Sequence, residues 1–163
     1  MDDALSLKRI GKVHPQLRDE LRRLFSEVNQ SLSGRAKCRI TQALRTFEQQ
    51  AVLFNKGRTT PGPKVTNARP GQSFHNYGLA VDFCLLVDDK EVSWDMAKDY
   101  DQDGMADWKE VVRIFKKYGW SWGGDWHSFK DFPHFEKTFG LGIKDCTRLY
   151  YSDKRDKDGY III

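Results

Sequence analysis

The chain has 163 residues, 39% of them hydrophobic, with 10 Phe, 6 Tyr and 5 Trp. This composition excludes a disordered chain and predicts one folded domain, residues 1–163, with its own core. No stretch approaches the roughly 18 apolar residues of a membrane helix, and the acidic N-terminus has no apolar signal core. We therefore expect synthesis in the cytoplasm and, for action outside, release by lysis or another export route. Three widely spaced cysteines exclude a disulfide framework and predict small buried side chains.

The charge is unevenly distributed along the chain. Residues 99–110 contain five carboxylates and one lysine, so they contribute −4 to a net charge of +4 and leave +8 for the remainder. A basic body favours an anionic partner, either cell-wall material or nucleic acid. Because no nucleic-acid-binding motif is present, we expect the wall and not nucleic acid. An ordinary solvated basic surface is the alternative.

The first half of the chain predicts two helices separated by a strand. The first helix begins at His14 and ends within residues 31–34, and residues 38–43 form the strand. The second helix begins at Thr46, ends at Gly57, and is expected to turn Ala51, Val52 and Phe54 inward. Three prolines and three glycines then predict a loop over residues 57–73. Apolar residues recur at helical spacing in the first helix: Leu17, Leu21, Leu24, Phe25 and Val28.

The second half predicts short strands and one strong helix. Residues 79–87 are apolar except for Asp82, a carboxylate that needs a partner in such a strand. Residues 107–118 form an amphipathic helix capped by Gly119, and residues 132–135 a strand. Asp158 and Gly159 predict a hairpin turn before an apolar strand over residues 160–163. Without regular strand–helix alternation, we predict an α+β fold whose small antiparallel sheet is flanked by helices.

Two histidines and an aspartate form a candidate zinc site on this sheet. His75 and Asp82 are seven residues apart, with Gly78 between them to bend the chain, and His134 follows on the strand at residues 132–135. Two imidazoles and one carboxylate suit a catalytic zinc ion, which keeps a fourth position for water. Asp131 is a second carboxylate, placed to take a proton from that water and give it to a leaving amine. The expected activity is that of a zinc hydrolase.

Three motifs between about Ile40 and Phe139 resemble the zinc D,D-carboxypeptidase and L-alanyl-D-glutamate endopeptidase family of peptidoglycan hydrolases. They are Ser73-x-His75-x-x-Gly78-x-Ala80-x-Asp82, Trp122-Gly123-Gly124-Asp125-Trp126 and Asp131-x-Pro133-His134-Phe135-Glu136. The tryptophan-rich motif is most similar to the phage endolysin and bacterial autolysin branch, which cuts the L-Ala–D-Glu bond. The resemblance implies that His75, Asp82 and His134 bind zinc and that Asp131 is the general base.

The resemblance also implies a role for Arg45. The family places an arginine after its first core strand, before a helix that carries Glu-Gln, and Arg45 followed by Glu48 and Gln49 matches. Its guanidinium would polarise the scissile carbonyl and hold the developing oxyanion. The alternative is a structural ion pair with Glu48 or Asp82. Residues 42–44 are Gln-Ala-Leu, where the family often has Ser-Gly-Tyr.

Residues 99–110 match the complete D-x-D-x-D-G-x5-E pattern of a calcium loop, and we expect them to be an EF-hand-like insertion. Five carboxylates in a short loop repel one another unless a cation lies among them, although an extended, solvated loop is the alternative. The preceding segment offers little more than a turn, so the motif is half an EF-hand. We expect Ca²⁺ to order the catalytic half and raise activity. The expected ligands are Asp99, Asp101, Asp103, the Met105 carbonyl, Asp107 and Glu110.

The leading interpretation is a monomeric zinc peptidase that hydrolyses peptidoglycan stem peptides between L-Ala and D-Glu. The alternatives are a D-Ala-D-Ala carboxypeptidase or dipeptidase of the same family, and a non-catalytic, calcium-dependent wall-binding module. His127 is expected either in the substrate groove or on the surface, whereas His14 is expected to be structural. Basic residues near the C-terminus would help to hold an anionic wall: Lys144, Arg148, Lys154, Arg155 and Lys157.

Overall fold

A computed structural model describes residues 3–163, and its elements agree with the expected α+β class. The α-helices are α1 (Ala4–Ile10), α2 (Arg18–Ser31), α3 (Phe47–Asn55), α4 (Asp107–Lys117) and α5 (Ile143–Tyr151). The strands are β1 (Ala36–Gln42), β2 (Ala80–Val87), β3 (Glu91–Ser93), β4 (Ser121–Trp122) and β5 (His134–Glu136). Three short 3-10 helices are η1 (Pro15–Leu17), η2 (Phe74–Tyr77) and η3 (Gly123–Asp125).

The five strands form one antiparallel sheet centred on β2. β1 pairs along one edge of β2, while β5 pairs with residues 80–82 and β3 with residues 85–87. β4 extends the sheet beyond β5. The strand at residues 79–87 is therefore central, which explains its nearly continuous apolar sequence.

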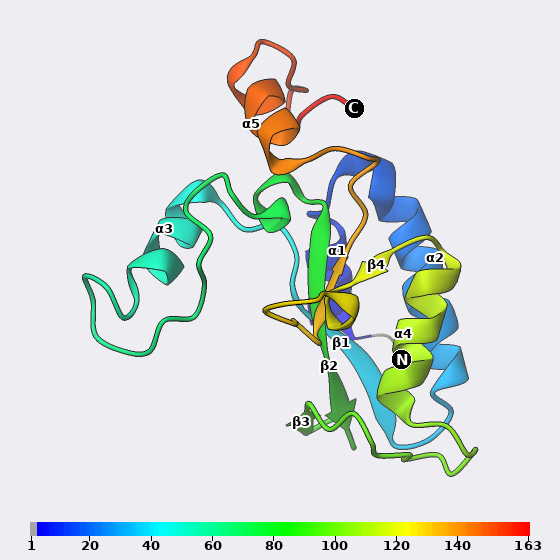
Figure 1. The fold of residues 1–163 in the computed structure, drawn as a ribbon. Coiled ribbons are helices and arrows are strands. Elements are labelled where there is room, and N and C mark those ends of the chain that lie inside the picture. Colours follow the sequence, from blue (N-terminus) through cyan, green and yellow to red (C-terminus); the bar gives the residue numbers. More distant parts are fainter. Residues whose placement is uncertain (1–2) are drawn as a thin grey trace.

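Helices cover the sheet unevenly (Figure 1). α2 and α4 lie side by side along one side of it, whereas α3 and the loop that follows extend away on the other side. α5 lies near the C-terminus, at the end of the sheet from which the chain leaves β5. No helix within residues 3–163 has the length and apolar character needed to cross a membrane.

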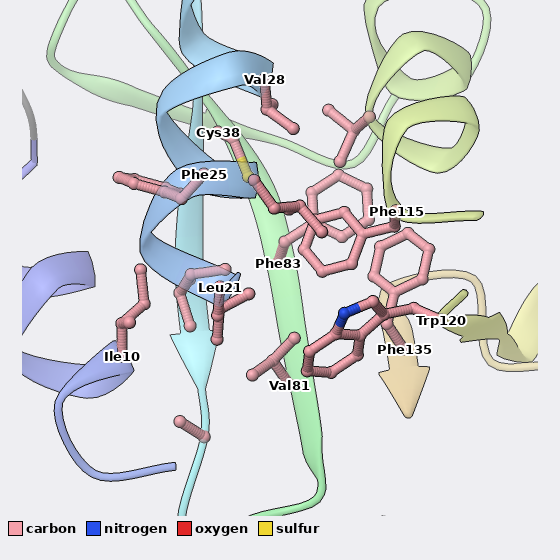
Figure 2. Close-up of a cluster of buried hydrophobic side chains, with 14 of the residues drawn as sticks. Ile10, Leu21, Phe25, Val28, Cys38, Val81, Phe83, Phe115, Trp120 and Phe135 are labelled. Atoms are coloured by element: carbon pink, nitrogen blue, oxygen red, sulfur yellow. The ribbon is translucent and has the colours of Figure 1, made fainter. Parts of the chain in front are cut away.

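Stacked aromatic rings form the centre of the core between the sheet and α4 (Figure 2). The rings of Phe115 and Phe135 stack with centroids 4.0 Å apart, and Phe83 lies 5.4 Å from Phe135 and 4.2 Å from Trp108. All four side chains are at most 1% exposed. Because Phe83 and Phe135 each follow a residue of the candidate site, this packing fixes the two strands that carry it.

The structure confirms the helix at residues 14–31 and the loop at residues 57–73, but it corrects the expected face of α3. Thr46 caps α3 by accepting from the Gln49 backbone N–H at 3.0 Å, and the Gln49 side chain accepts from the Thr46 N–H at 2.9 Å. Val52, expected to point inward, is 67% exposed, whereas Gln50 is fully buried. Gln50 is buried because its side chain accepts from Arg45 at 3.0 Å and donates to the Ala68 carbonyl at 2.9 Å.

The prediction of a C-terminal strand at residues 160–163 is wrong. Only an isolated bridge joins Arg155 and Ile161 after the turn, because this segment packs against the N-terminal region instead of pairing with the sheet. The Ile161 carbonyl lies 2.7 Å from His14 Nε2, and the Tyr160 hydroxyl donates to the Lys12 carbonyl at 2.7 Å. His14, expected to be structural, is buried there. Cys38, Cys84 and Cys146 are free and buried, as expected.

Two α-helices, α1 and α5, and two strands, β3 and β4, were not predicted from the sequence. α1 is only seven residues long, and β3 only three, too short for a hydrophobic period. α5 begins after Gly142, whose backbone N–H donates to Asp145 at 2.9 Å. Its Cys146 is buried, and Tyr150 stacks on Phe47 of α3 at 4.4 Å. α5 therefore depends on contacts with distant residues.

Candidate metal centre

The pairing of β2 with β5 brings Asp82 and His134 side by side. The register places Asp82 opposite His134 on one side and opposite Gln42 of β1 on the other. Directly opposed residues point to the same face of a sheet, so the three side chains form a row across it. Phe135, between His134 and Glu136, points into the core as expected and is fully buried.

His75 reaches this row from η2, just before β2. Ser73 caps η2 by accepting from the His75 backbone N–H at 3.3 Å. Gly78 ends it with φ +69°, and a Cβ there would lie 2.6 Å from the His14 nitrogen. Glycine is therefore required where the chain turns from η2 into β2. This confirms the expected bend between His75 and Asp82.

The three predicted zinc ligands converge on one point. Asp82 Oδ1 lies 3.2 Å from His75 Nε2 and 3.1 Å from His134 Nδ1, and the donor atoms of all three residues lie within 4.8 Å of one another. Ligands about 2.1 Å from a tetrahedral zinc ion are about 3.4 Å apart. The spacing of these donors therefore fits a zinc ion among them, and the two imidazoles and one carboxylate suit that metal.

The outer nitrogens of both imidazoles have partners that leave the inner nitrogens free to bind metal. His75 Nδ1 lies 2.8 Å from the Ala43 carbonyl, so it carries the proton and donates. His134 Nε2 lies 3.0 Å from Glu136 Oε1, which accepts in the same way. Such partners fix the tautomer and orientation of metal-binding histidines. Glu136 had no assigned role in the sequence, although its position two residues after His134 was the available signal.

The charges around the histidines are strongly coupled. Burial alone would lower the pKa of His134, but its hydrogen bonds to Asp82 and Glu136 outweigh burial and raise that pKa to about 9. Burial would raise the pKa of Asp82, yet the charge of His75 and the hydrogen bonds from both histidines hold it well below its usual range. Asp82 is thus held in its charged carboxylate form, which can bind a cation.

Asp131 lies at the edge of the same cluster. Its Oδ2 is 4.0 Å from His134 Nδ1, and its backbone N–H donates to the Gly123 carbonyl at 3.1 Å. A Cβ on Gly123 would lie 2.2 Å from the backbone carbonyl oxygen of Asp131, so only glycine allows the two backbones to come this close. Burial, followed by the negative charge of Asp82, raises the pKa of Asp131. A raised carboxyl pKa suits a group that accepts and returns a proton near neutral pH.

Arg45 faces the cluster from the segment after β1. Its Nη1 donates to Gln50 Oε1 at 3.0 Å and its Nε to Gln42 Oε1 at 3.3 Å. Within residues 3–163 it makes no ion pair shorter than 4.0 Å, so the alternative pairing with Glu48 or Asp82 is absent. The role of Gln50 as a partner of Arg45 was not predicted from the sequence. The available signal was that this polar residue shares a helix face with Phe47 and Phe54.

A groove of about 820 Å³ joins these residues. Its lining includes Val65 and Gln72 from the loop after α3, and Trp126 and Asp131 from the segment before β5. The Trp126 ring lies 5.2 Å from the His134 ring. His127 is exposed, in agreement with the surface alternative.

The acidic loop at residues 99–110 brings its carboxylates together in two groups. One contains Asp99, Asp101 and Asp107, and the other Asp101, Asp103 and Glu110. Asp107 and Glu110 are 0% and 3% exposed, and within residues 3–163 neither Asp107 Oδ2 nor Glu110 Oε2 has a hydrogen-bond partner. Residues 93–98 form no helix, and α4 follows the loop.

Residues 66–137, which contain His75, Asp82, Asp131 and His134, match the family model of D-alanyl-D-alanine carboxypeptidase. The chain is 53% identical over 97 residues to peptidoglycan L-alanyl-D-glutamate endopeptidase CwlK of Bacillus subtilis (strain 168), an alignment that covers 60% of this chain and 58% of CwlK. Over the residues that carry the candidate metal centre, the chain is therefore similar to this peptidase family.

Other proteins show the same similarity. An L-alanyl-D-glutamate peptidase of Listeria phage A118 is 30% identical over 145 residues, 84% of this chain and 45% of the phage protein. The chain thus spans about half the length of these curated relatives. The L-Ala D-Glu endopeptidase ChiX of Serratia marcescens has a similar structure, with a TM-score of 0.54 and 28% identity over 83% of this chain and 88% of ChiX.

The fold is also shared with the vancomycin resistance D,D-dipeptidase VanXYg. That structure has a TM-score of 0.51 and covers 90% of this chain and 62% of its own. At 19% identity this likeness concerns the fold alone.

Proposed function

We propose that this protein is a zinc peptidase that hydrolyses the L-alanyl-D-glutamate bond of peptidoglycan stem peptides. The observation that carries the proposal is the meeting of His75 Nε2, Asp82 Oδ1 and His134 Nδ1 at distances that suit one zinc ion. CwlK and the phage A118 protein, by their names, act on this bond. The carboxypeptidase name of the family model supports D-Ala-D-Ala cleavage as the second candidate.

Each residue has a distinct part in the proposed reaction. His75, Asp82 and His134 would hold the zinc ion, which would supply Lewis acidity toward a carbonyl oxygen and toward water. Asp131 takes the proton from the attacking water and delivers it to the leaving amine, a task suited to its raised pKa. Arg45 holds the carbonyl oxygen as negative charge develops on it.

The charge of the surface beside the groove supports an anionic substrate. A hollow of about 460 Å³ shares Gln42, Arg45 and Leu53 with the groove. It is also lined by Arg9 and Lys12, and among residues 3–163 no acidic residue lines it. Stem peptides carry several carboxylates, which such a surface attracts.

Mass spectrometry of muropeptides after digestion of purified peptidoglycan tests the proposal. We expect new carboxyl-terminal L-Ala and amino-terminal D-Glu. Release of D-Ala would instead establish the second candidate, and binding to the wall without any cleavage would establish a non-catalytic module. Asp131→Asn should lower the rate by about 10²–10⁴-fold. Asp153→Asn is the matched control, because Asp153 is exposed and should leave the rate unchanged.

We further propose that residues 99–110 bind Ca²⁺, with Asp99, Asp101, Asp103, Asp107, Glu110 and the Met105 carbonyl as ligands. The pattern supports this, and so do the buried, unpartnered oxygens of Asp107 and Glu110. Buried polar oxygens are normally satisfied, and oxygen ligands of this number suit calcium. Gly104, at φ +97°, supplies the turn that the pattern requires.

A calcium loop here would influence the catalytic half through α4. α4 begins at Asp107 and leads directly to β4, η3 and Asp131. We expect a chelator that removes calcium but spares zinc to slow the hydrolysis of peptidoglycan. Unchanged rates, with the calcium content shown to have fallen, would reject the regulatory part of this proposal.

A further inference from the structure

Phe129 combines two features that the fold does not require. Its side chain is 84% exposed, the most among the large hydrophobic residues of the described chain, residues 3–163. Its φ is +51°, a left-handed backbone that is strained for a bulky side chain and easier for asparagine or glycine. Phe129 therefore gains little from burial and also strains the backbone.

Phe129 lies at the groove that contains the candidate metal ligands. Phe129 lines the groove of the candidate metal centre, between Trp126 and Asp131 in sequence. From the loop after α3, Val65 lines the same groove and is 52% exposed. Two exposed apolar side chains from separate segments thus line the groove that contains the candidate ligands.

The segment that carries Phe129 is anchored on both sides. The Trp126 backbone N–H donates to the Gly123 carbonyl at 3.3 Å, and the Asp131 N–H donates to the same carbonyl at 3.1 Å. Lys130 Nζ also donates to the Gly124 carbonyl at 3.1 Å. Backbone strain persists where the surroundings determine the conformation in this way, and such strain is concentrated at binding sites.

We propose that Phe129 is a specificity-determining residue that contacts the substrate, packing its ring on an apolar surface of the peptidoglycan chain in the groove. The inference rests on the proposed function, because it takes this groove to be the substrate site. A stem peptide rich in carboxylates offers two surfaces of this kind, the alanyl methyl groups and the C–H faces of the attached sugar. Aromatic rings pack on both, and burial of an exposed phenyl ring favours the complex.

The test replaces Phe129 by asparagine, which adopts the left-handed region more readily. Phe129→Asn should raise Tm by about 2–4 °C through relief of strain, and raise KM by about 10-fold through loss of the contact. The kcat should stay unchanged. Phe129→Tyr retains the ring and should retain the wild-type KM. The matched control is Phe139→Asn, because Phe139 also has a positive φ, +54°, but does not line the groove; its KM should not change.

Two substrates identify the surface that is contacted. A rise in KM with a free stem peptide assigns the contact to the peptide, and a rise only with a muropeptide assigns it to the sugar. An unchanged KM with both would overturn the proposal, and so would a lower Tm of Phe129→Asn, which would indicate a structural role. Binding to purified cell walls, measured by sedimentation in the Asp131→Asn background, reports on Phe129 independently of which bond is cut. Failure of the proposed reaction is thereby distinguished from failure of this inference.

Discussion

Removing one buried carboxylate of the acidic loop should abolish the effect of calcium on stability without weakening the calcium-free protein. This carboxylate belongs to Glu110, which is 3% exposed. Its Oε1 accepts from the Ser31 hydroxyl at 2.6 Å, whereas its Oε2 has no hydrogen-bond partner within residues 3–163. An unpartnered buried polar atom costs about 1–3 kcal/mol. Glu110→Gln keeps the shape and removes the charge, so the calcium-free variant should be as stable as the wild type or more stable.

The magnitude of the calcium effect follows from mass action. With a Kd of about 10 μM, 1 mM Ca²⁺ stabilises the folded state by about 2.7 kcal/mol. For a domain of this size, that corresponds to a rise in Tm of about 5–10 °C. The assay is thermal unfolding of the zinc-loaded protein followed by circular dichroism, with and without calcium. Glu91→Gln, which changes an exposed carboxylate, is the matched control and should keep the full shift. An equal calcium shift in Glu110→Gln would refute the reasoning.

The pH dependence of the calcium-free protein provides a second check on the same carboxylates. Burial, together with neighbouring aspartates, raises the pKa of Asp107 and of Glu110. For an acid whose folded-state pKa is raised, the stabilising contribution is complete below the unfolded pKa and is lost as the pH rises through the folded pKa. The contribution of these two residues to calcium-free stability should therefore increase from neutral pH toward about pH 4. The free energies of unfolding of the wild type and of Glu110→Gln, measured by urea titration without calcium, should therefore become more similar as the pH falls over that interval.

Three further predictions concern other parts of the molecule. Glu136→Gln should lower zinc affinity by about 10–100-fold, as measured by competition with a chromophoric chelator, and an unchanged affinity would remove Glu136 from the site. Asp3→Asn should destabilise at pH 7, because its hydrogen bond with Arg39 lowers the pKa of Asp3. That stabilisation is present above the unfolded pKa of about 4 and is lost as the pH falls through the lower folded pKa. The denaturant midpoints of the variant and the wild type should therefore become equal at acidic pH. Phe83→Ala should reduce the free energy of unfolding by about 3–5 kcal/mol, and a loss below about 1 kcal/mol in urea would contradict the stacking seen between Phe83 and Phe135.

The sequence by itself determined the class of the fold and the identity of the candidate ligands. Helical periodicity identified α2 and α4, and the one carboxylate in an apolar strand identified Asp82, because both signals depend only on local spacing and polarity. The spacing of His75, Asp82 and His134 likewise needed no structure. Gly78 marked the bend between His75 and Asp82, and the close approach of the His14 backbone explains why glycine is required there.

Only the tertiary structure decided what surrounds those ligands. The register of β2 with β5, which puts Asp82 opposite His134, depends on pairing between residues 52 positions apart. The partners Ala43 and Glu136, the support of Arg45 by Gln50, and the exposed, strained Phe129 arise from contacts or backbone angles that no periodic pattern encodes. The C-terminal segment was mispredicted as a strand for the same reason, since an apolar run does not specify whether it pairs with a sheet or packs against residues distant in sequence.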